Sequence, residues 1–371
     1  MFGFPHCRHA APDPGTPPRR RHAKFPQKSL ERPAARLYIG GRGNAPRKSH
    51  GKESEMKYTD FGKFMAALES GKIPGVILWQ GASAIDGTPI VLVANKFADN
   101  SENDKTGAMV QTFILPDPHA AGIECNGARP AKIMAWLKAT GGKSICGDCP
   151  HAWQFDAASG EYRKGACYVI EYQSPAATLG AVYRGAYPIA GVDFPAAWIG
   201  KLGAGQDIRA GSYGDPAACP PDVWHAFLER ARTRTGYTHM WKSAYAGARR
   251  NAFRMRGVVM ASCDSAADLR AARDAGFRAF YVTPANSLDN SRSVLSVGAH
   301  VDGAMLCPAS DEFEQVAGRK TQCVKCGACS GADGKGARMP DVFIPAHGAG
   351  AKKIAGDACP AAARILERMG A

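Results

Sequence analysis

The hydrophobic pattern becomes regular at about residue 56. Phe61, Phe64, Met65 and Leu68 recur at helical spacing, which predicts an amphipathic helix at the start of this region. Three apolar runs follow, GVILWQG, TPIVLVANKF and MVQTFILP, and glycine, proline or polar loops bound each of them. Such runs are typical of strands. We therefore expect a small antiparallel sheet, followed by a helix over about 130–139.

From about residue 205 short apolar runs alternate with helical stretches. We expect helices over 221–234 and 265–276, the second opened by a capping box from Ser265 to Asp268. The expected strands lie in DIRAGSYGDP, GYTHMW, RGVVMASCDS, RAFYVTP, AMLCPAS and DVFIPAHG. Strand, helix and strand in series predict right-handed βαβ units and a parallel sheet. The predicted fold class is α/β, a partial or full (β/α) barrel with a small β-rich region before it and cysteine-rich metal loops.

Polar residues follow the apolar cores of these expected strands. They are Ser212, Tyr213, Asp215, His239, Trp241, Ser262, Cys263, Asp264, Thr283 and Cys307. In parallel βα folds the carboxyl ends of the strands carry the functional site. Asp215, His239 and Asp264 are therefore candidate catalytic residues, and Ser212 and Tyr213 are candidate cofactor-binding residues. Each also has an ordinary structural explanation as a turn former, a helix support or a satisfied hydrogen-bonding group.

Seven of the twelve cysteines fall into two sets with the spacing of metal ligands. The first set is Cys146, Cys149 and Cys167, and the second is Cys307, Cys323, Cys326 and Cys329. The second set resembles the bacterial ferredoxin run, in which closely spaced thiolates hold an iron–sulfur cluster. Zinc is the alternative, because C-x-x-C pairs also form zinc knuckles, and the two sets could share one ion. The spacing alone does not separate iron from zinc.

The first set shows three ligands, and its fourth could be Cys125, His151, water or a small molecule. We expect a strand to begin at Cys167-Tyr168-Val169 and a further helix to run from Ser174-Pro175 towards Arg184. Disulfides are disfavoured because no apolar run near residue 1 is typical of a signal peptide. Buried free thiols explain Cys219 and Cys263 well, but a glycine-rich loop such as QCVKCGACSGADGKG offers no core to bury three of them.

Charge is concentrated at the start of the chain. The chain carries a net charge of +14, and residues 1–55 hold twelve Lys and Arg against four Asp and Glu. This proline- and arginine-rich segment shows no periodicity, so we expect a disordered basic extension. It is either an over-extended start that precedes the true one at Met56, which we favour, or an arm that grips nucleic acid. The expected organisation is 1–55 as this extension, 56–140 as a small α+β region and 141–371 as the βα-repeat domain.

Several residues and motifs together resemble a family of phage and prophage proteins. They are SICGDCP with a later CYV, IRAGSYGDPAACP, TGYTHMW, VVMASCDS with AGFRAFYV, and LCPAS with CVKCGACSG. The similarity runs from about Met56 to the end, and it implies no established activity. The cysteine loop ahead of a βα-repeat also loosely resembles radical SAM-like barrels. This chain lacks their C-x-x-x-C-x-x-C triad, the motif that holds the cluster which binds S-adenosylmethionine.

Two hypotheses from different classes follow. The first is an iron–sulfur enzyme acting on an unknown small-molecule or macromolecular substrate, with S-adenosylmethionine as a weakly supported cofactor. The second is a zinc-stapled, non-catalytic phage protein that binds nucleic acid or has a structural role. No phosphate-binding P-loop, H-E-x-x-H or G-x-S-x-G motif occurs, which disfavours those enzyme classes. No apolar stretch approaches the roughly 20 residues of a membrane span, so we expect a cytoplasmic protein without a membrane partner.

Overall fold

The computed structural model describes residues 56–98, 103–125, 129–283, 300–301, 303–346 and 350–354, and every structural statement below concerns these residues. All of them fall within one compact unit. The expectations for residues 1–55 lie outside the described residues.

The first elements match the hydrophobic pattern. Helix α1 (Phe61–Glu69) begins after Asp60, whose side chain accepts a hydrogen bond from Lys63 N at 3.0 Å, and it buries Phe64 and Leu68. Strands β1 (Gly75–Ala82), β2 (Pro89–Asn95) and β3 (Val110–Pro116) pair antiparallel in that order. The predicted helix and the predicted small antiparallel sheet are both confirmed. This sheet is not separate, however, because β3 also pairs in parallel with β6 (Asp207–Tyr213).

The strands form one ten-stranded sheet in the order β1-β2-β3-β6-β7-β8-β9-β12-β11-β10. Pairing is parallel from β3 to β11 and antiparallel at both edges. The remaining strands of this sheet are β7 (Thr233–Thr238), β8 (Met260–Cys263), β9 (Ala279–Thr283), β10 (His300–Val301), β11 (Ala304–Leu306) and β12 (Val342–Pro345). The fold is mixed α/β with a mostly parallel sheet. Within the described ranges no pairing joins β1 to β10, so these strands do not close a full barrel.

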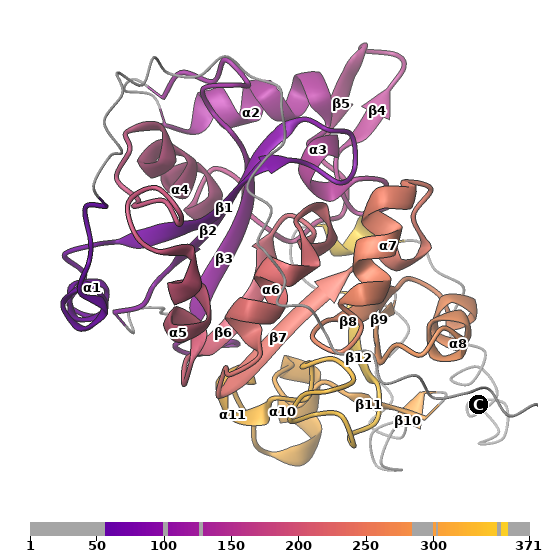
Figure 1. The fold of residues 1–371 in the computed structure, drawn as a ribbon. Helices are drawn as coiled ribbons and strands as arrows, with labels where there is room; N and C mark the ends of the chain where they lie inside the picture. The colour runs from indigo at the N-terminus through magenta and orange to yellow at the C-terminus, as the bar shows by residue number, and fades with distance from the viewer. Residues whose placement is uncertain are drawn as a thin grey trace, which may run out of the picture. The chain divides into compact units, whose positions relative to one another are not determined.

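Helices cover one face of the parallel strands (Figure 1). They are α5 (Ile199–Gly203), α6 (Pro221–Leu228), α7 (Ala246–Arg254) and α8 (Ala266–Asp274). Side chains alternate along a strand, so every second residue faces these helices. Ala261 and Tyr281 do so and join the main core with Leu269. Residues at the alternate positions of the same strands, such as Met260 and Phe280, point to the second face of the sheet and belong to a smaller hydrophobic cluster.

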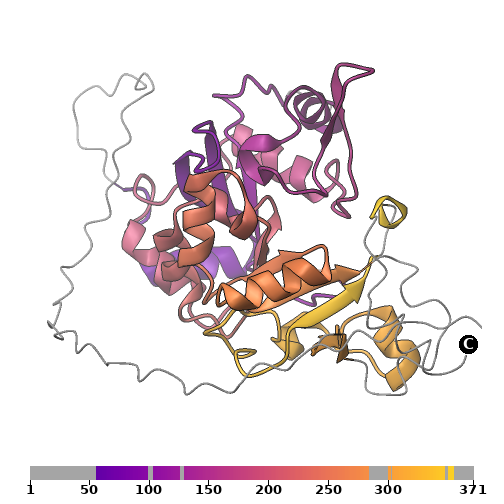
Figure 2. The same cartoon turned by 90° about the vertical axis from the view of Figure 1, so that its right-hand side faces the viewer.

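The other elements stand above and below this framework (Figures 1 and 2). Before β6 lie α2 (Arg129–Thr140), α3 (Lys143–Cys146), the hairpin β4 (Gln154–Asp156) and β5 (Glu161–Arg163), and α4 (Ser174–Tyr183). Between β11 and β12 lie α10 (Asp311–Ala317) and the short α11 (Cys323–Cys326). Short 3₁₀ turns occur at η1 (Ala196–Trp198), η2 (Pro216–Ala218), η3 (Met240–Lys242) and η4 (Ala351–Lys353). No helix of the described part of the chain is long and apolar enough to cross a membrane.

Two sequence predictions about these elements are wrong. The helix expected over 221–234 ends at Leu228, because Thr233 and Arg234 already belong to β7 and are buried there. The strand expected at Cys167 does not form, and residues 167–170 have no regular structure. The N-cap half of the capping box predicted for α8 is confirmed, since the Ser265 side chain accepts from Asp268 N at 3.1 Å, while the Asp268 carboxylate accepts from Asp264 N.

The second cysteine loop packs against the second face of the sheet. The sequence predicts that this loop has no core of its own, but Ala328 and Cys329 are buried against Met260, Val342 and Ile344. Two buried arginines fix it in addition. Arg234 donates to Ser330 O at 3.0 Å, and Arg278 donates to the carbonyl of Ala328. The loop is thus held by packing and hydrogen bonds as well as by any metal it binds.

We predict that Arg234→Met lowers the free energy of unfolding by at least about 2 kcal/mol, because it leaves buried carbonyls without donors. In the wild type Arg234 donates to Ser330 O, Leu228 O and Gly257 O at 3.0–3.1 Å. Urea unfolding measures the change, and Arg270→Met on the exposed side of α8 is the matched control. Equal stability of the two variants would show that the arginine clamp does not hold the loop.

Candidate functional site

The polar residues expected at strand ends do lie there. Ser212 and Tyr213 end β6, and Thr283 ends β9. Asp215 follows β6 after one glycine, and His239, Asp264 and Cys307 come directly after β7, β8 and β11. These strands run parallel, so their carboxyl ends lie at one edge of the sheet.

A cavity of about 380 Å³ lies over the second face of the sheet. Its lining alternates along the strands, with Tyr237 and His239 from the β7 region, Phe280 and Val282 from β9, and Ile344 from β12. All seven cysteines of the two sets also line it: Cys146, Cys149, Cys167, Cys307, Cys323, Cys326 and Cys329. The structure therefore brings together two sets that are more than a hundred residues apart in sequence.

Backbone contacts position the first cysteine set. Cys149 N donates to Cys146 O at 3.2 Å, and Cys167 N donates to His151 O at 2.8 Å. Gly147 lies between the first two cysteines with φ +57°, and a Cβ there would stand 2.6 Å from Met240 Sδ. Glycine is required at this position both for the backbone conformation and for the close approach to Met240.

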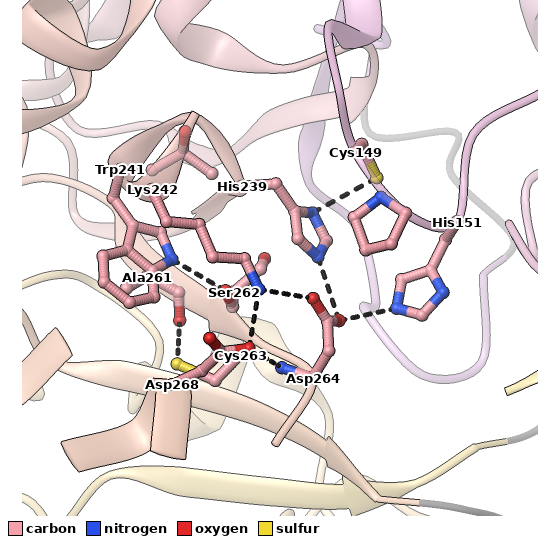
Figure 3. Close-up of polar contacts among 12 residues, drawn as sticks. Cys149, His151, His239, Trp241, Lys242, Ala261, Ser262, Cys263, Asp264 and Asp268 are labelled. Carbon is pink, nitrogen blue, oxygen red and sulfur yellow. Dashed lines mark hydrogen bonds and ion pairs between the residues drawn. The ribbon is translucent and has the colours of Figure 1, made fainter. Parts of the chain in front are cut away.

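A chain of polar contacts connects Cys149 to Asp264 (Figure 3). The Cys149 Sγ atom lies 3.4 Å from His239 Nδ1, and His239 Nε2 lies 3.2 Å from Asp264 Oδ1. His151 Nε2 lies 2.7 Å from the same Asp264 oxygen. Lys242 Nζ donates to Asp264 Oδ2 at 2.8 Å and to Asp268 Oδ2 at 2.6 Å. One carboxylate thus holds two imidazoles and an ammonium group beside a cysteine.

These contacts shift the pKa values of the groups involved. Burial alone would lower the pKa of His239, but the Cys149 sulfur and the Asp264 carboxylate raise it well above its usual value. Burial would raise the pKa of Asp264, yet hydrogen bonds from the two histidines and from Lys242 hold it well below its usual range. The cluster therefore favours a charged carboxylate next to a protonated imidazole.

Asp215 is placed at the site in a supporting role. Its oxygens accept from Thr238 Oγ1 at 2.7 Å, His239 N at 2.8 Å and Ala217 N at 2.9 Å. Burial raises the pKa of Asp215, and these hydrogen bonds oppose that rise. Asp215 thus binds the backbone N–H of His239 and fixes the segment that carries the His239 ring.

The two candidate cofactor-binding residues also line the cavity. The Ser212 hydroxyl donates to Gln111 Oε1 at 2.6 Å, so its proton is already committed. Tyr213 is buried, and burial raises the pKa of its phenol well above the usual value. Of the residues named as a fourth ligand of the first set, His151 lies at the cavity and Cys125 does not line it.

The sequence did not single out three residues that shape this site. Lys242, Arg209 and Tyr168 are not among the predicted site residues, because their roles come from contacts between distant segments. The two isolated cysteines behave as predicted, because Cys219 and Cys263 are fully buried in the main core. All ten cysteines of the described residues are free thiols.

Burial favours the neutral thiol form of several of these cysteines. It raises the pKa of Cys146 and Cys329 well above the usual value, and that of Cys167 and Cys307 to about 11. Metal binding by these groups would require each thiol to lose its proton to the thiolate form. Within the described ranges, however, the one set of three candidate ligand atoms all within 4.8 Å of one another is that of His151, His239 and Asp264.

No protein-family model, curated protein or solved structure matches this chain. The likeness to phage proteins and to radical SAM-like barrels therefore rests on the motifs alone.

We predict that Asp264→Asn lowers the free energy of unfolding by about 2–3 kcal/mol at pH 5.5, because it leaves a protonated imidazole and an ammonium group without their carboxylate. Folding raises the pKa of His239, so the protonated ring stabilises the fold fully below about pH 6.5, and this contribution is lost as the pH rises through the folded value. Folding lowers the pKa of Asp264, so its contribution is lost only as the pH falls below about 4. The loss in the variant is therefore largest between about pH 4 and 6.5 and smaller at pH 9.

Denaturant unfolding at pH 5.5 and pH 9 measures this dependence. The wild type and the variant are compared at equal metal content. Asp222→Asn is the matched control, because Asp222 forms an exposed ion pair with Arg254 at 2.7 Å and its loss costs less than about 1 kcal/mol. A pH-independent loss in Asp264→Asn would contradict the proposed charge states.

Proposed function

We propose that this chain is an iron–sulfur enzyme in which each cysteine set holds one metal centre and the substrate binds in the cavity that both sets line. The observation that carries the proposal is the common cavity of about 380 Å³ with all seven cysteines on its walls. A protein that uses metal only to staple two loops has no need to place both sets on one cavity. Cavities of this size and mixed lining are typical of small-molecule sites.

No compact zinc-type group of thiols occurs among the described residues. In a tetrahedral zinc site, Zn–S bonds of about 2.3 Å hold neighbouring thiolates roughly 3.8 Å apart. No three cysteine sulfurs of the described residues all lie within 4.8 Å of one another. An iron–sulfur cluster spaces its thiolates more widely, because each cysteine binds a different iron atom.

An enzyme is supported by the incomplete ligand set of Cys146, Cys149 and Cys167. Three protein ligands leave a position for substrate or cofactor, as in catalytic metal sites. The cluster would supply one-electron chemistry when bound. The chain itself supplies a proton at His239 Nδ1 or Nε2, which Asp264 holds in place beside Cys149 and the cavity.

The finer parts of the proposal rest on resemblance and on partial geometry. Helices on one face of a parallel sheet and a cavity on the other are the arrangement of a βα-barrel wall, which supports a partial barrel. A radical SAM-like activity with S-adenosylmethionine at the open position, and a phage origin, are suggested by the sequence motifs. The missing C-x-x-x-C-x-x-C triad weighs against S-adenosylmethionine.

The alternative is a zinc-stapled protein that binds nucleic acid without catalysis. The basic composition of residues 1–55 favours it, with twelve Lys and Arg against four Asp and Glu. The polar cluster at the cavity does not favour it. Nothing in this alternative requires a buried imidazole and carboxylate beside a cysteine.

We predict that anaerobically purified protein is brown and that Cys149→Ser and Cys326→Ser each remove about four iron atoms per chain. Iron is lost because each variant removes a cysteine ligand of a different metal centre. Iron and acid-labile sulfide analysis, visible absorbance and electron paramagnetic resonance of the reduced protein measure the loss. Cys125→Ser is the control, because Cys125 is partly exposed and does not line the cavity. Stoichiometric zinc without iron in the wild type would overturn the proposal.

We further predict that deleting residues 1–55 leaves iron content and thermal stability unchanged, because this segment has no periodic apolar face to bury. Binding of single- and double-stranded DNA is measured alongside as a function of salt. Loss of a salt-dependent affinity with the fold intact would instead support the nucleic-acid arm.

A further inference from the structure

One cation on the cavity wall is not paired with a carboxylate. Arg209 belongs to β6, and it lines the cavity together with Gly211 and Tyr213, the alternate residues of the same strand. Its guanidinium donates to the Tyr168 hydroxyl and lies 5.9 Å from the centre of that ring. None of the ion pairs among the described residues involves Arg209.

Arg209 lies between the two cysteine sets. Its hydrogen-bond partner Tyr168 directly follows Cys167 of the first set. It also lines the same cavity as Cys323 and Cys326 of the second set. A ligand bound to this guanidinium would therefore lie near both centres.

The walls around this cation are mostly apolar. The rings of Tyr237 and Phe280 pack with centroids 4.4 Å apart, and Val282, Val342 and Ile344 continue the same lining. Arg209 shares these apolar walls with a second cation, Lys105, and cations within apolar walls select a ligand with an anionic group and an apolar body. A free inorganic anion would leave those apolar walls uncovered, and a cationic ligand would be repelled by the guanidinium.

We propose that the cavity binds an organic anion, a carboxylate or phosphate ester with an apolar or aromatic body, whose charged group pairs with Arg209. Arginine suits this role because its planar fork can donate two hydrogen bonds to one such group. The inference rests on the proposed function only in assigning this anion as the substrate or cofactor of the iron–sulfur enzyme. The binding itself requires only the cavity.

The competing explanation is that Arg209 is a counter-charge for an anionic metal–thiolate centre at the second set. In that case Arg209→Gln shifts the reduction potential of that centre and leaves ligand binding unchanged. Arg209→Lys keeps the positive charge but loses the bidentate fork. It therefore separates the role of counter-charge to the metal centre from the role of binding the organic anion.

The test is calorimetric titration of the iron-loaded protein with 2-naphthoate and with its neutral analogue 2-naphthamide. We expect 2-naphthoate to bind the wild type at least tenfold more tightly than 2-naphthamide. We expect Arg209→Gln to weaken 2-naphthoate at least tenfold without changing 2-naphthamide, and Arg209→Lys to fall between them. Arg270→Gln on the exposed side of α8 is the control and should match the wild type.

The outcomes separate this inference from the proposed function. If the wild type does not prefer the anion, or Arg209→Gln binds it as tightly, the inference is overturned while the iron content still decides the function. If the wild type carries no iron but 2-naphthoate binding depends on Arg209, the iron–sulfur proposal fails and the anion site stands.

Discussion

The alternation of side chains along the parallel strands is the constraint on which the rest of the structure depends. One face of β6 to β12 is buried under helices, as Ala261 and Tyr281 show. The other face must also be covered, because Met260, Phe280 and Val342 project from it. Among the described residues the second cysteine loop packs on this face, and residues of the first loop join it in lining the cavity over the sheet. The functional site is thus a consequence of how the second face is covered.

The polar cluster is organised by a single carboxylate. Asp264 can stay charged while largely buried only because two imidazoles and Lys242 surround it. Those three groups come from the first cysteine loop and from the end of β7, so the same carboxylate ties the loop to the sheet. A structural ion cluster and a positioned imidazole beside Cys149 are therefore the same set of contacts.

The sequence predicts what is periodic and misses what is held by distant contacts. The apolar face of α1 and the strands β1 to β3 can be identified from their hydrophobic pattern in the sequence. The positions of the polar residues at strand ends follow from the alternation of strands and helices. The first half of β7 cannot be identified from the sequence, because Thr233 and Arg234 resemble the polar end of a helix. Only the structure shows that Arg234 donates to three buried carbonyls. Cys167-Tyr168-Val169 has a strand-like composition but finds no partner strand in the structure. Likewise, no local pattern could place Arg209 beside Tyr168, since 41 residues separate them.

Three arginines near the second face differ in what their donors contact, and the difference separates support from recognition. Arg234 and Arg278 donate to backbone carbonyls of the second cysteine loop and its neighbours, so their charges are used to hold the chain. Arg209 donates to one phenol, and no backbone carbonyl or carboxylate of the described residues accepts from it. A guanidinium carries five donors in a fixed fork, and one protein partner leaves donors of Arg209 available at the cavity that this residue lines. Arg234 and Arg278 use their charge on main-chain carbonyls, whereas the proposed organic anion would complete the partners of Arg209.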